Sequence, residues 1–329
     1  MSYNAALLRA LAPGAPVSGE ALGRELGISR AAVWKAVRRL VELGTPVTAL
    51  PGRGYRLEKA FVPLREDAIR RALPSAVAGR VGVLEVLAET DSTNARVLAA
   101  DRPVGELVIC LAEYQSAGRG RRGRRWLAPP GAAICLSVGG RLPAAPSDYA
   151  SLPTAVGVAC AAALESFGVP GIGLKWPNDL LRGAGKLGGI LIELRGEAQG
   201  PATVAVGIGL NVRLGEPTRA AVTAAGGVPP ADLADLADEG GVDRNALAAT
   251  LAAAIAGCLA RAPAGLGPDV LEGWRRRDVL RDRRVRVLDA GPGQAGIARG
   301  LDATGALLLD TEGGPRRITA GEVSLRLER

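Results

Sequence analysis

The sequence predicts a mixed α/β protein (α+β type) in three parts: a small helical head, a central sheet with helices and an all-β tail. Three observations predict this order. Short glycine-stopped helical segments come first, apolar strands mixed with long helices follow, and short strands separated by turns close the chain. The central strands and helices do not alternate regularly, so we expect a mixed sheet and not a doubly wound one. We expect three domains, at residues 1–60, 61–273 and 274–329.

Two neighbouring helices in the head predict a helix-turn-helix motif. After a helix over 4–12, a second helix is capped by Ser18 and ends at Gly27, and a third is capped by Ser29 and ends at Gly44. The third helix has an apolar face of Val33, Val37, Leu40 and Val41, and a polar face of Arg30, Lys35, Arg38, Arg39 and Glu42. Segments 47–50 and 55–57 flank Pro51-Gly-Arg-Gly54, which predicts a hairpin wing with Arg53 at its tip.

Positive charge is concentrated at the two ends of the chain. Residues 1–59 hold nine Lys/Arg and four acids, a net charge of +5, and residues 275–329 hold twelve and eight, a net charge of +4. The remaining residues carry −1. A basic head on a nearly neutral body suggests that the head binds a polyanion.

The middle of the chain, after a linker at 61–63 and a short helix at 64–72, mixes both element types. Strands are expected at 82–87, 106–114, 132–138, 173–175, 186–194 and 202–210, and helices at 92–100, 149–167 and 244–260. Segment 214–241 is rich in Gly, Pro, Ala and Thr and is expected to include a mobile loop. In the tail, strands at 284–288, 296–301, 306–309 and 316–319 predict a small barrel.

Composition excludes several kinds of chemistry. The chain has no histidine, which excludes Ser-His-Asp and Cys-His catalysis and His-ligated metals. Its four cysteines form no CxxC pair, and three of them lie in apolar stretches, where we expect small core residues. We expect neither a disulfide framework nor a zinc site. No apolar run reaches the roughly 18 residues that span a bilayer, and no secretory pattern begins the chain. We therefore expect a cytoplasmic protein.

The most informative segment is Glu113-Tyr-Gln-Ser-Ala-Gly-Arg-Gly-Arg-Arg-Gly-Arg-Arg-Trp126. Five arginines lie between 119 and 125, with glycines among them. Glycine lets a backbone approach a ligand closely, and arginine donates forked hydrogen bonds to phosphate or carboxylate. A solvated basic loop or a nucleic-acid contact is the alternative. The GxGxxG spacing is not a dinucleotide fingerprint, because 124–130 cannot open a helix.

Four shorter segments complete the candidate site, and each also has a purely structural explanation. Lys175-Trp-Pro-Asn-Asp179 presents Asn178 and Asp179 at a strand end, or is an ordinary turn. Lys186 begins an apolar strand, where it either extends to solvent or neutralises a phosphate. Thr90-Asp-Ser-Thr-Asn94 precedes a helix, where its hydroxyls either cap the helix or bind a polar ligand. Val206-Gly-Ile-Gly-Leu-Asn-Val212 is either a bulged strand or a floor under a ligand.

Together these segments resemble the bifunctional biotin–protein ligases that also act as biotin operon repressors. The order and spacing of the motifs match from about residue 18 to the end. In the head, Gly27-Ile-Ser-Arg-Ala-Ala32 and Pro51-Gly-Arg-Gly-Tyr55 match as well, and in the tail Gly321-Glu-Val-Ser-Leu325 does. The resemblance implies a winged helix-turn-helix domain, a biotin/lipoyl-ligase-like catalytic domain and an SH3-like barrel. Trp34 departs from the family, in which a smaller polar side chain is common at this position.

The resemblance also implies substrates and residue roles. The family forms biotinyl-5′-AMP from biotin and MgATP, then transfers biotin to a lysine of the biotin carboxyl carrier protein of acetyl-CoA carboxylase. The implied biotin ligands are Ser92, Thr93, Asn94, Gln115, Arg119, Gly120, Arg121 and Lys186. The implied ATP and adenylate contacts are Arg119, Arg121, Trp126, Asn178, Lys186 and Asn211. Lys186, Arg121 and Asp179 are the implied catalytic residues, and no protein-held metal is expected.

The regulatory half follows from the same resemblance. An adenylate-bound homodimer would present two heads to operator DNA, with Arg30, Lys35, Arg38 and Arg53 as contacts. Three alternatives stay open at this point: a repressor that no longer catalyses, a lipoate ligase of the same fold, and a ligase whose head does not regulate.

Overall fold

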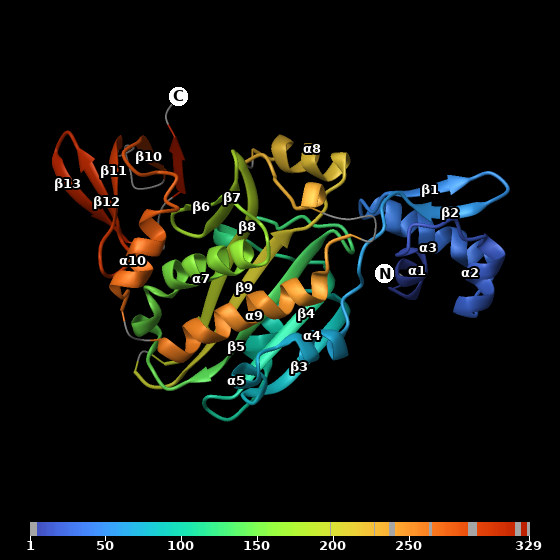
Figure 1. The fold of residues 1–329 in the computed structure, drawn as a ribbon, viewed down its shortest axis with the longest axis horizontal. Coiled ribbons are helices and arrows are strands. Elements are labelled where there is room, and N and C mark those ends of the chain that lie inside the picture. Colours follow the sequence, from blue (N-terminus) through green and yellow to red (C-terminus); the bar gives the residue numbers. More distant parts are fainter. Residues whose placement is uncertain are drawn as a thin grey trace.

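The computed structural model describes residues 5–197, 199–226, 228–236, 241–262, 265–288, 295–319 and 324–327. A helical head, a central sheet covered by helices and a small β tail follow one another along the chain (Figure 1). This confirms the predicted mixed α/β class and the order of the parts, while the exact boundaries at 60/61 and 273/274 stay predictions. None of the helices described has both the length and the apolar character needed to cross a membrane.

The head is a winged helix-turn-helix. Its helices are α1 (Ala5–Leu11), α2 (Gly19–Leu26) and α3 (Arg30–Glu42), and its wing is the antiparallel pair β1 (Val47–Leu50) and β2 (Gly54–Leu57). Ser18 and Ser29 cap α2 and α3 by accepting hydrogen bonds from backbone amides, as predicted. The chain leaves α2 through Gly27 at a φ of 65°, which favours glycine.

The predicted apolar face of α3 is wrong at one residue, Val41. Val33, Val37 and Leu40 are buried in the core of the head, but Val41 is 48% exposed. Successive helical residues differ by about 100°, which places Val41 at the margin of the stripe that Val33, Val37 and Leu40 define. Its side chain therefore lies outside the core of the head.

The central sheet has seven strands in the order β3-β4-β5-β9-β8-β7-β6. They are β3 (Val81–Thr90), β4 (Leu107–Gln115), β5 (Ala133–Leu142), β6 (Ile172–Lys175), β7 (Asp179–Arg182), β8 (Gly185–Arg195) and β9 (Ala202–Asn211). Only β3 and β4 pair in parallel, so the sheet is mixed, as predicted. Strand β7 was not predicted, and its four residues begin inside the predicted Asn178-Asp179 turn.

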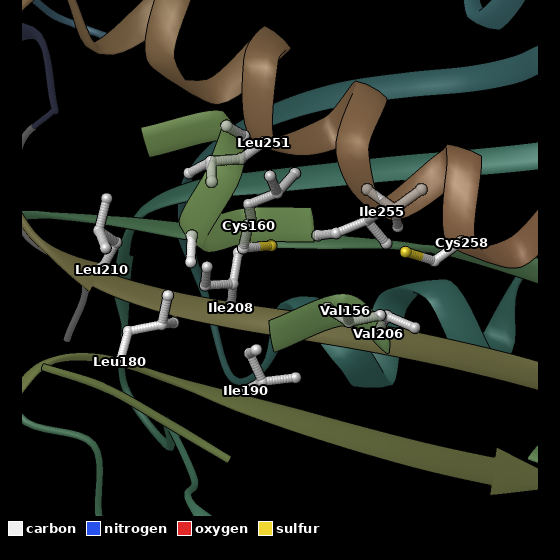
Figure 2. Close-up of a cluster of buried hydrophobic side chains, with 14 of the residues drawn as sticks. Val156, Cys160, Leu180, Ile190, Val206, Ile208, Leu210, Leu251, Ile255 and Cys258 are labelled. Atoms are coloured by element: carbon white, nitrogen blue, oxygen red, sulfur yellow. The ribbon is translucent and has the colours of Figure 1, made fainter. Parts of the chain in front are cut away.

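Helices cover the two faces of this sheet differently. On one face α7 (Leu152–Ser166) and α9 (Arg244–Arg261) enclose the main core, in which Cys160 and Cys258 lie among aliphatic side chains (Figure 2). On the other, α6 (Thr93–Ala99) packs on strands β4, β5 and β9. All four cysteines are buried, and burial raises the pKa of each thiol. The interpretation of three of them as small core residues is confirmed, and the fourth is buried as well.

Segment 214–241 corrects another prediction, because it contains the helix α8 (Glu216–Ala224) where a loop was expected. Glu216 and Pro217 in the first turn, followed by alanines, favour this helix. The helix predicted at 64–72 is slightly shorter in the structure, as α4 (Glu66–Ala72). Two further helices, α5 (Ser75–Ala78) and α10 (Pro268–Arg275), had not been predicted.

The tail is an antiparallel sheet in the order β13-β12-β11-β10-β14. Its strands are β10 (Arg284–Leu288), β11 (Ala295–Leu301), β12 (Leu307–Thr311), β13 (Gly314–Ile318) and β14 (Ser324–Leu327). Val285, Leu307 and Leu309 of this sheet belong to the same buried cluster as α7 and α9. The tail is therefore packed onto the central part of the chain and is not a separate appendage.

Candidate functional site

One cavity of about 250 Å³ gathers the predicted pocket residues. It lies between the start of α6, the arginine-rich loop after β4, the β7–β8 hairpin and α8. Every residue proposed from the sequence for catalysis, biotin or nucleotide lines it: Ser92, Thr93, Asn94, Gln115, Arg119, Gly120, Arg121, Trp126, Asn178, Asp179, Lys186 and Asn211. Residues up to 119 positions apart in the sequence thus share one wall.

The first turn of α6 forms the neutral polar end of the cavity. Ser92 accepts a hydrogen bond from the Ala95 amide at 3.4 Å and so caps the helix, yet it also lines the cavity. The capping and binding interpretations of this serine therefore coexist. Thr93 donates both its amide and its hydroxyl to Gln115 Oε1, at 2.8 and 3.1 Å. Hydrogen bonds within the protein therefore orient Thr93 and Gln115 toward each other.

The arginine-rich loop is folded back on itself. The Gly120 amide donates to Arg124 O at 2.7 Å, and the Trp126 amide donates to Gly118 O at 2.9 Å. No helix follows, which agrees with rejecting a dinucleotide fingerprint. Burial lowers the pKa of the Arg121 guanidinium, and Asp179 opposes the shift. Arginine nonetheless stays protonated in proteins, so the loop presents cationic donors to the cavity.

Lys186 and Asp179 form an ion pair inside the cavity. Lys186 Nζ lies 2.5 Å from Asp179 Oδ1, and the β7–β8 hairpin holds both residues. Gly189 leaves room beside them, because a Cβ there would lie 3.3 Å from Lys186 Nζ. The preceding Trp176 is buried and donates from Nε1 to Gly305 O at 3.0 Å, which fastens this turn to the tail.

The cavity's asparagines also hold backbone. Asn178 Nδ2 donates to Ile190 O at 2.7 Å. Asn211 Nδ2 donates to Lys186 O at 3.2 Å and to Ala231 O at 3.0 Å. Both side chains therefore shape the cavity wall in addition to lining it.

The glycines of β9 make room for side chains of the site. A Cβ on Gly207 would lie 2.4 Å from Asn94 Oδ1, and one on Gly209 would lie 2.6 Å from the Trp126 ring. Gly207 and Gly209 both line the cavity, so this strand forms part of its wall, while a floor under a ligand stays a prediction. The space they leave is taken by Asn94 and Trp126.

Three residues of the site were given no functional role from the sequence. Ser137 of β5 is fully buried and contacts both Thr93 and Asn94, and its only sequence signal is a hydroxyl within an apolar strand. Glu193 of β8 contacts Asn94 and Arg119, and it lies just beyond the conspicuous Lys186-Leu-Gly-Gly motif. Val222 of α8 lines the cavity, which could not be expected while the segment was interpreted as a loop.

The site offers little for a protein-held metal. Within the described ranges, no group of three or more Cys, Asp or Glu side chains gathers, and Asp179 is the only carboxylate of these ranges that lines the cavity. Since Asp179 is already paired with Lys186, cationic side chains dominate the site's chemistry.

The predicted DNA contacts lie elsewhere, on the head. Arg30, Lys35, Arg38 and Arg53 are all exposed. Trp34 is also exposed, and the Arg38 guanidinium lies 4.9 Å from the centre of its ring. The head and the cavity are therefore separate sites on one chain.

Comparisons with known proteins agree with this division. Residues 86–211 match the model of the biotin/lipoate A/B protein ligase family, residues 5–56 match an HTH domain, and residues 282–326 match the biotin protein ligase C-terminal domain. The structure of a biotin protein ligase from Aquifex aeolicus, in complex with biotin and ATP, has the same fold. Its TM-score is 0.59 at 24% identity, over 76% of this chain and 99% of that one.

Relatives extend the similarity to the whole chain. The bifunctional ligase/repressor BirA of Salmonella typhimurium is 38% identical over 97% of this chain and 96% of its own length, and that of Escherichia coli is 37% identical over the same shares. The biotin–[acetyl-CoA-carboxylase] ligase of Mycobacterium tuberculosis is 37% identical over 79% of this chain and 95% of its own. With all three domains and nearly full-length coverage, this chain belongs to the family of bifunctional biotin–protein ligases and repressors.

Proposed function

We propose that this chain activates biotin with MgATP to biotinyl-5′-AMP and transfers biotin to a lysine of the biotin carboxyl carrier protein of acetyl-CoA carboxylase. The observation that supports it most is a single cavity with a neutral polar end at α6 and a cationic end at Lys186 and Arg121. Biotin has the matching form, with a neutral ureido head at one end and a carboxylate at the other.

In the first step a biotin carboxylate oxygen attacks the α-phosphorus, and the bond from that phosphorus to pyrophosphate breaks. Arg119, Arg121 and Lys186 are proposed to stabilise the negative charge on carboxylate and phosphate oxygens. Lys186 has three protons to donate, so its contact with Asp179 leaves donors for the ligand. Mg²⁺ enters with ATP as part of the substrate, held mainly by phosphates and water.

In the second step the amine of the carrier lysine attacks the carbonyl carbon of the mixed anhydride, and AMP leaves. We assign the ureido head to Ser92, Thr93, Asn94 and Gln115, with Gly120 letting the loop approach the ligand closely. Asn178 and Asp179 face the reacting centre, and Trp126 and Asn211 lie by the nucleotide. Asp179, by orienting the Lys186 ammonium, keeps the cation at that centre during both steps.

For the head we propose binding to operator DNA through Arg30, Lys35, Arg38 and Arg53, with repression of biotin synthesis genes. Biotinyl-5′-AMP is the proposed corepressor, and an adenylate-bound homodimer would match a two-fold operator. Both proposed partners, operator DNA and the carrier protein, require the protein to act in the cytoplasm.

The decisive experiment uses the purified full chain with biotin and MgATP. We expect biotinyl-5′-AMP to form without a carrier, and a carrier domain, when it is added, to gain the mass of one biotinyl group, which is biotin less one water. No adenylate and no labelled carrier would refute the enzymatic proposal. A gel shift with the upstream region of biotin synthesis genes, with and without biotin and ATP, tests repression separately.

A further inference from the structure

Asn94 is held by three neighbouring strands beneath the first turn of α6. Ser137 of β5, Gly207 of β9 and Leu191 of β8 are register partners in one row across the sheet. Asn94 Oδ1 accepts a hydrogen bond from Ser137 Oγ at 2.7 Å, and Nδ2 donates to Leu191 O at 3.1 Å and to Glu193 Oε2 at 2.8 Å. Both amide protons of this buried side chain are therefore used within the protein.

The row is built to receive this side chain. Gly207 presents no Cβ, and one would lie 2.4 Å from Asn94 Oδ1. Ser137 is fully buried and also lies 2.7 Å from Thr93 Oγ1. One buried hydroxyl thus contacts two neighbouring residues at the polar end of the cavity.

Glu193 connects this polar end to the arginine-rich loop. Its Oε2 accepts from Asn94, and its Oε1 lies 3.7 Å from Arg119 Nη2. Glu193 itself does not line the cavity. Its carboxylate lies behind the wall and touches one cavity residue from each of two separate elements.

We propose that Glu193, together with Ser137, is a positioning residue that aligns Asn94 and Arg119 so that one ligand meets both. This inference rests on the proposed function, because biotin is the ligand that would span the two. Of the two contacts of Glu193, the one with Asn94 should be stronger than the one with Arg119. A charge-assisted hydrogen bond to a buried amide is stronger than a half-exposed ion pair at 3.7 Å.

Two variants of Glu193 separate its two contacts. Glu193→Ala removes both, leaving a buried Asn94 proton unpaired. Glu193→Gln keeps an oxygen that accepts from Asn94 but removes the charge facing Arg119. In biotin-dependent ATP–pyrophosphate exchange we expect Glu193→Ala to raise the biotin KM about tenfold with kcat within about twofold, and Glu193→Gln to raise KM less than about threefold.

The loop contact has its own readout. Both variants lose the carboxylate charge beside Arg119, so Glu193→Gln should release biotinyl-5′-AMP about two- to threefold faster than the unmodified chain. Glu193→Ala, which also disturbs Asn94 at the ureido head, should release it faster still. Ser137→Ala keeps Glu193 but removes the hydroxyl under Thr93 and Asn94. It should raise the biotin KM severalfold and speed release of the adenylate by a similar factor, because biotinyl-5′-AMP carries the same ureido head.

Glu85→Gln is the matched control. It also removes a carboxylate that contacts α6, but this carboxylate contacts Arg96 on the exposed side of the helix. We expect unchanged KM, kcat and release for this variant. If Glu193→Gln raises KM as much as Glu193→Ala, or if Glu193→Ala leaves KM unchanged, the inference is wrong. If the unmodified chain itself shows no exchange, the proposed function fails instead.

Discussion

Two ion pairs in this molecule have nearly the same chemistry but different surroundings. Arg244 and Glu113, at the junction of head and body, approach to 2.8 Å with side chains 1% and 6% exposed. Lys186 and Asp179, in the cavity, approach to 2.5 Å with side chains 29% and 18% exposed. The first pair lies inside the protein and the second opens onto a space for a ligand.

The buried pair is enclosed by backbone of its own chain. Glu113 Oε1 accepts from the Leu64 amide at 2.7 Å, and Arg244 donates to Val62 O at 3.2 Å and to Ala133 O at 2.7 Å. The neighbouring Asn245 also binds this linker, donating to Pro63 O at 3.0 Å. These contacts fasten the segment that joins the head to the central sheet.

The difference shows how exposure separates a structural pair from a functional one. A charge that is desolvated and enclosed by the fold is out of reach of a ligand, and its removal lowers the stability of the protein. A partly exposed cationic side chain keeps donors for a ligand, so its removal lowers activity before it lowers stability. Four variants test this comparison, from the largest expected effect to the smallest.

Arg244→Ala should cost the most stability, about 3–5 kcal/mol in the free energy of unfolding, because it leaves the buried Glu113 carboxylate uncompensated. Urea unfolding followed by circular dichroism measures the loss. Arg24→Ala, which breaks an exposed pair with Glu20 on α2, is the control and should cost less than about 1 kcal/mol. If both variants lost a similarly small free energy of unfolding, the buried pair would not differ from an exposed one.

Lys186→Ala should reverse this pattern. Adenylate formation should slow by about 10²–10³-fold, as for the loss of one donor to developing charge, while the free energy of unfolding changes by less than about 1 kcal/mol. Single-turnover formation of biotinyl-5′-AMP gives the rate, and urea unfolding gives the stability. Near-normal turnover would exclude Lys186 from the reacting centre.

Arg121→Gly should loosen retention of the adenylate, because it removes a charged donor from the cavity wall. We expect release about tenfold faster, with little change in stability. Arg121→Ala separates the lost guanidinium from the added freedom of glycine and should give a similar rate. Release no faster than in the unmodified chain would contradict the assignment of this loop.

Trp34→Ala extends the comparison to the head. Its half-exposed ring contacts Arg38 but fills no core position, so unfolding should change by less than about 1 kcal/mol. Affinity for a DNA fragment that the unmodified chain binds should fall about threefold or more, since apolar side chains on such helices contact base methyl groups. Fluorescence anisotropy checks the affinity, and unchanged binding would place Trp34 outside the interface.

Local signals explain why much of the fold could be predicted. Ser18 and Gly27 mark the ends of α2 within the sequence itself, and the apolar strands of the sheet are continuous runs. The candidate site was found because its residue types are unusual together: spaced arginines, an Asn-Asp turn and one lysine opening an apolar strand. Short or ambiguous segments were missed, as with β7 and α8, because four residues or an Ala/Thr-rich stretch carry a weak signal.

By itself, therefore, the sequence determined the local elements, the three-part order and the cationic chemistry of the site, because caps, periodicity and residue type act over a few positions. Only the tertiary structure decided which side chains meet. Asn94 reaches Glu193, and Glu113 reaches Arg244, across the packing of strands and helices far apart in the chain. Such contacts depend on sheet order and register, which local periodicity does not encode.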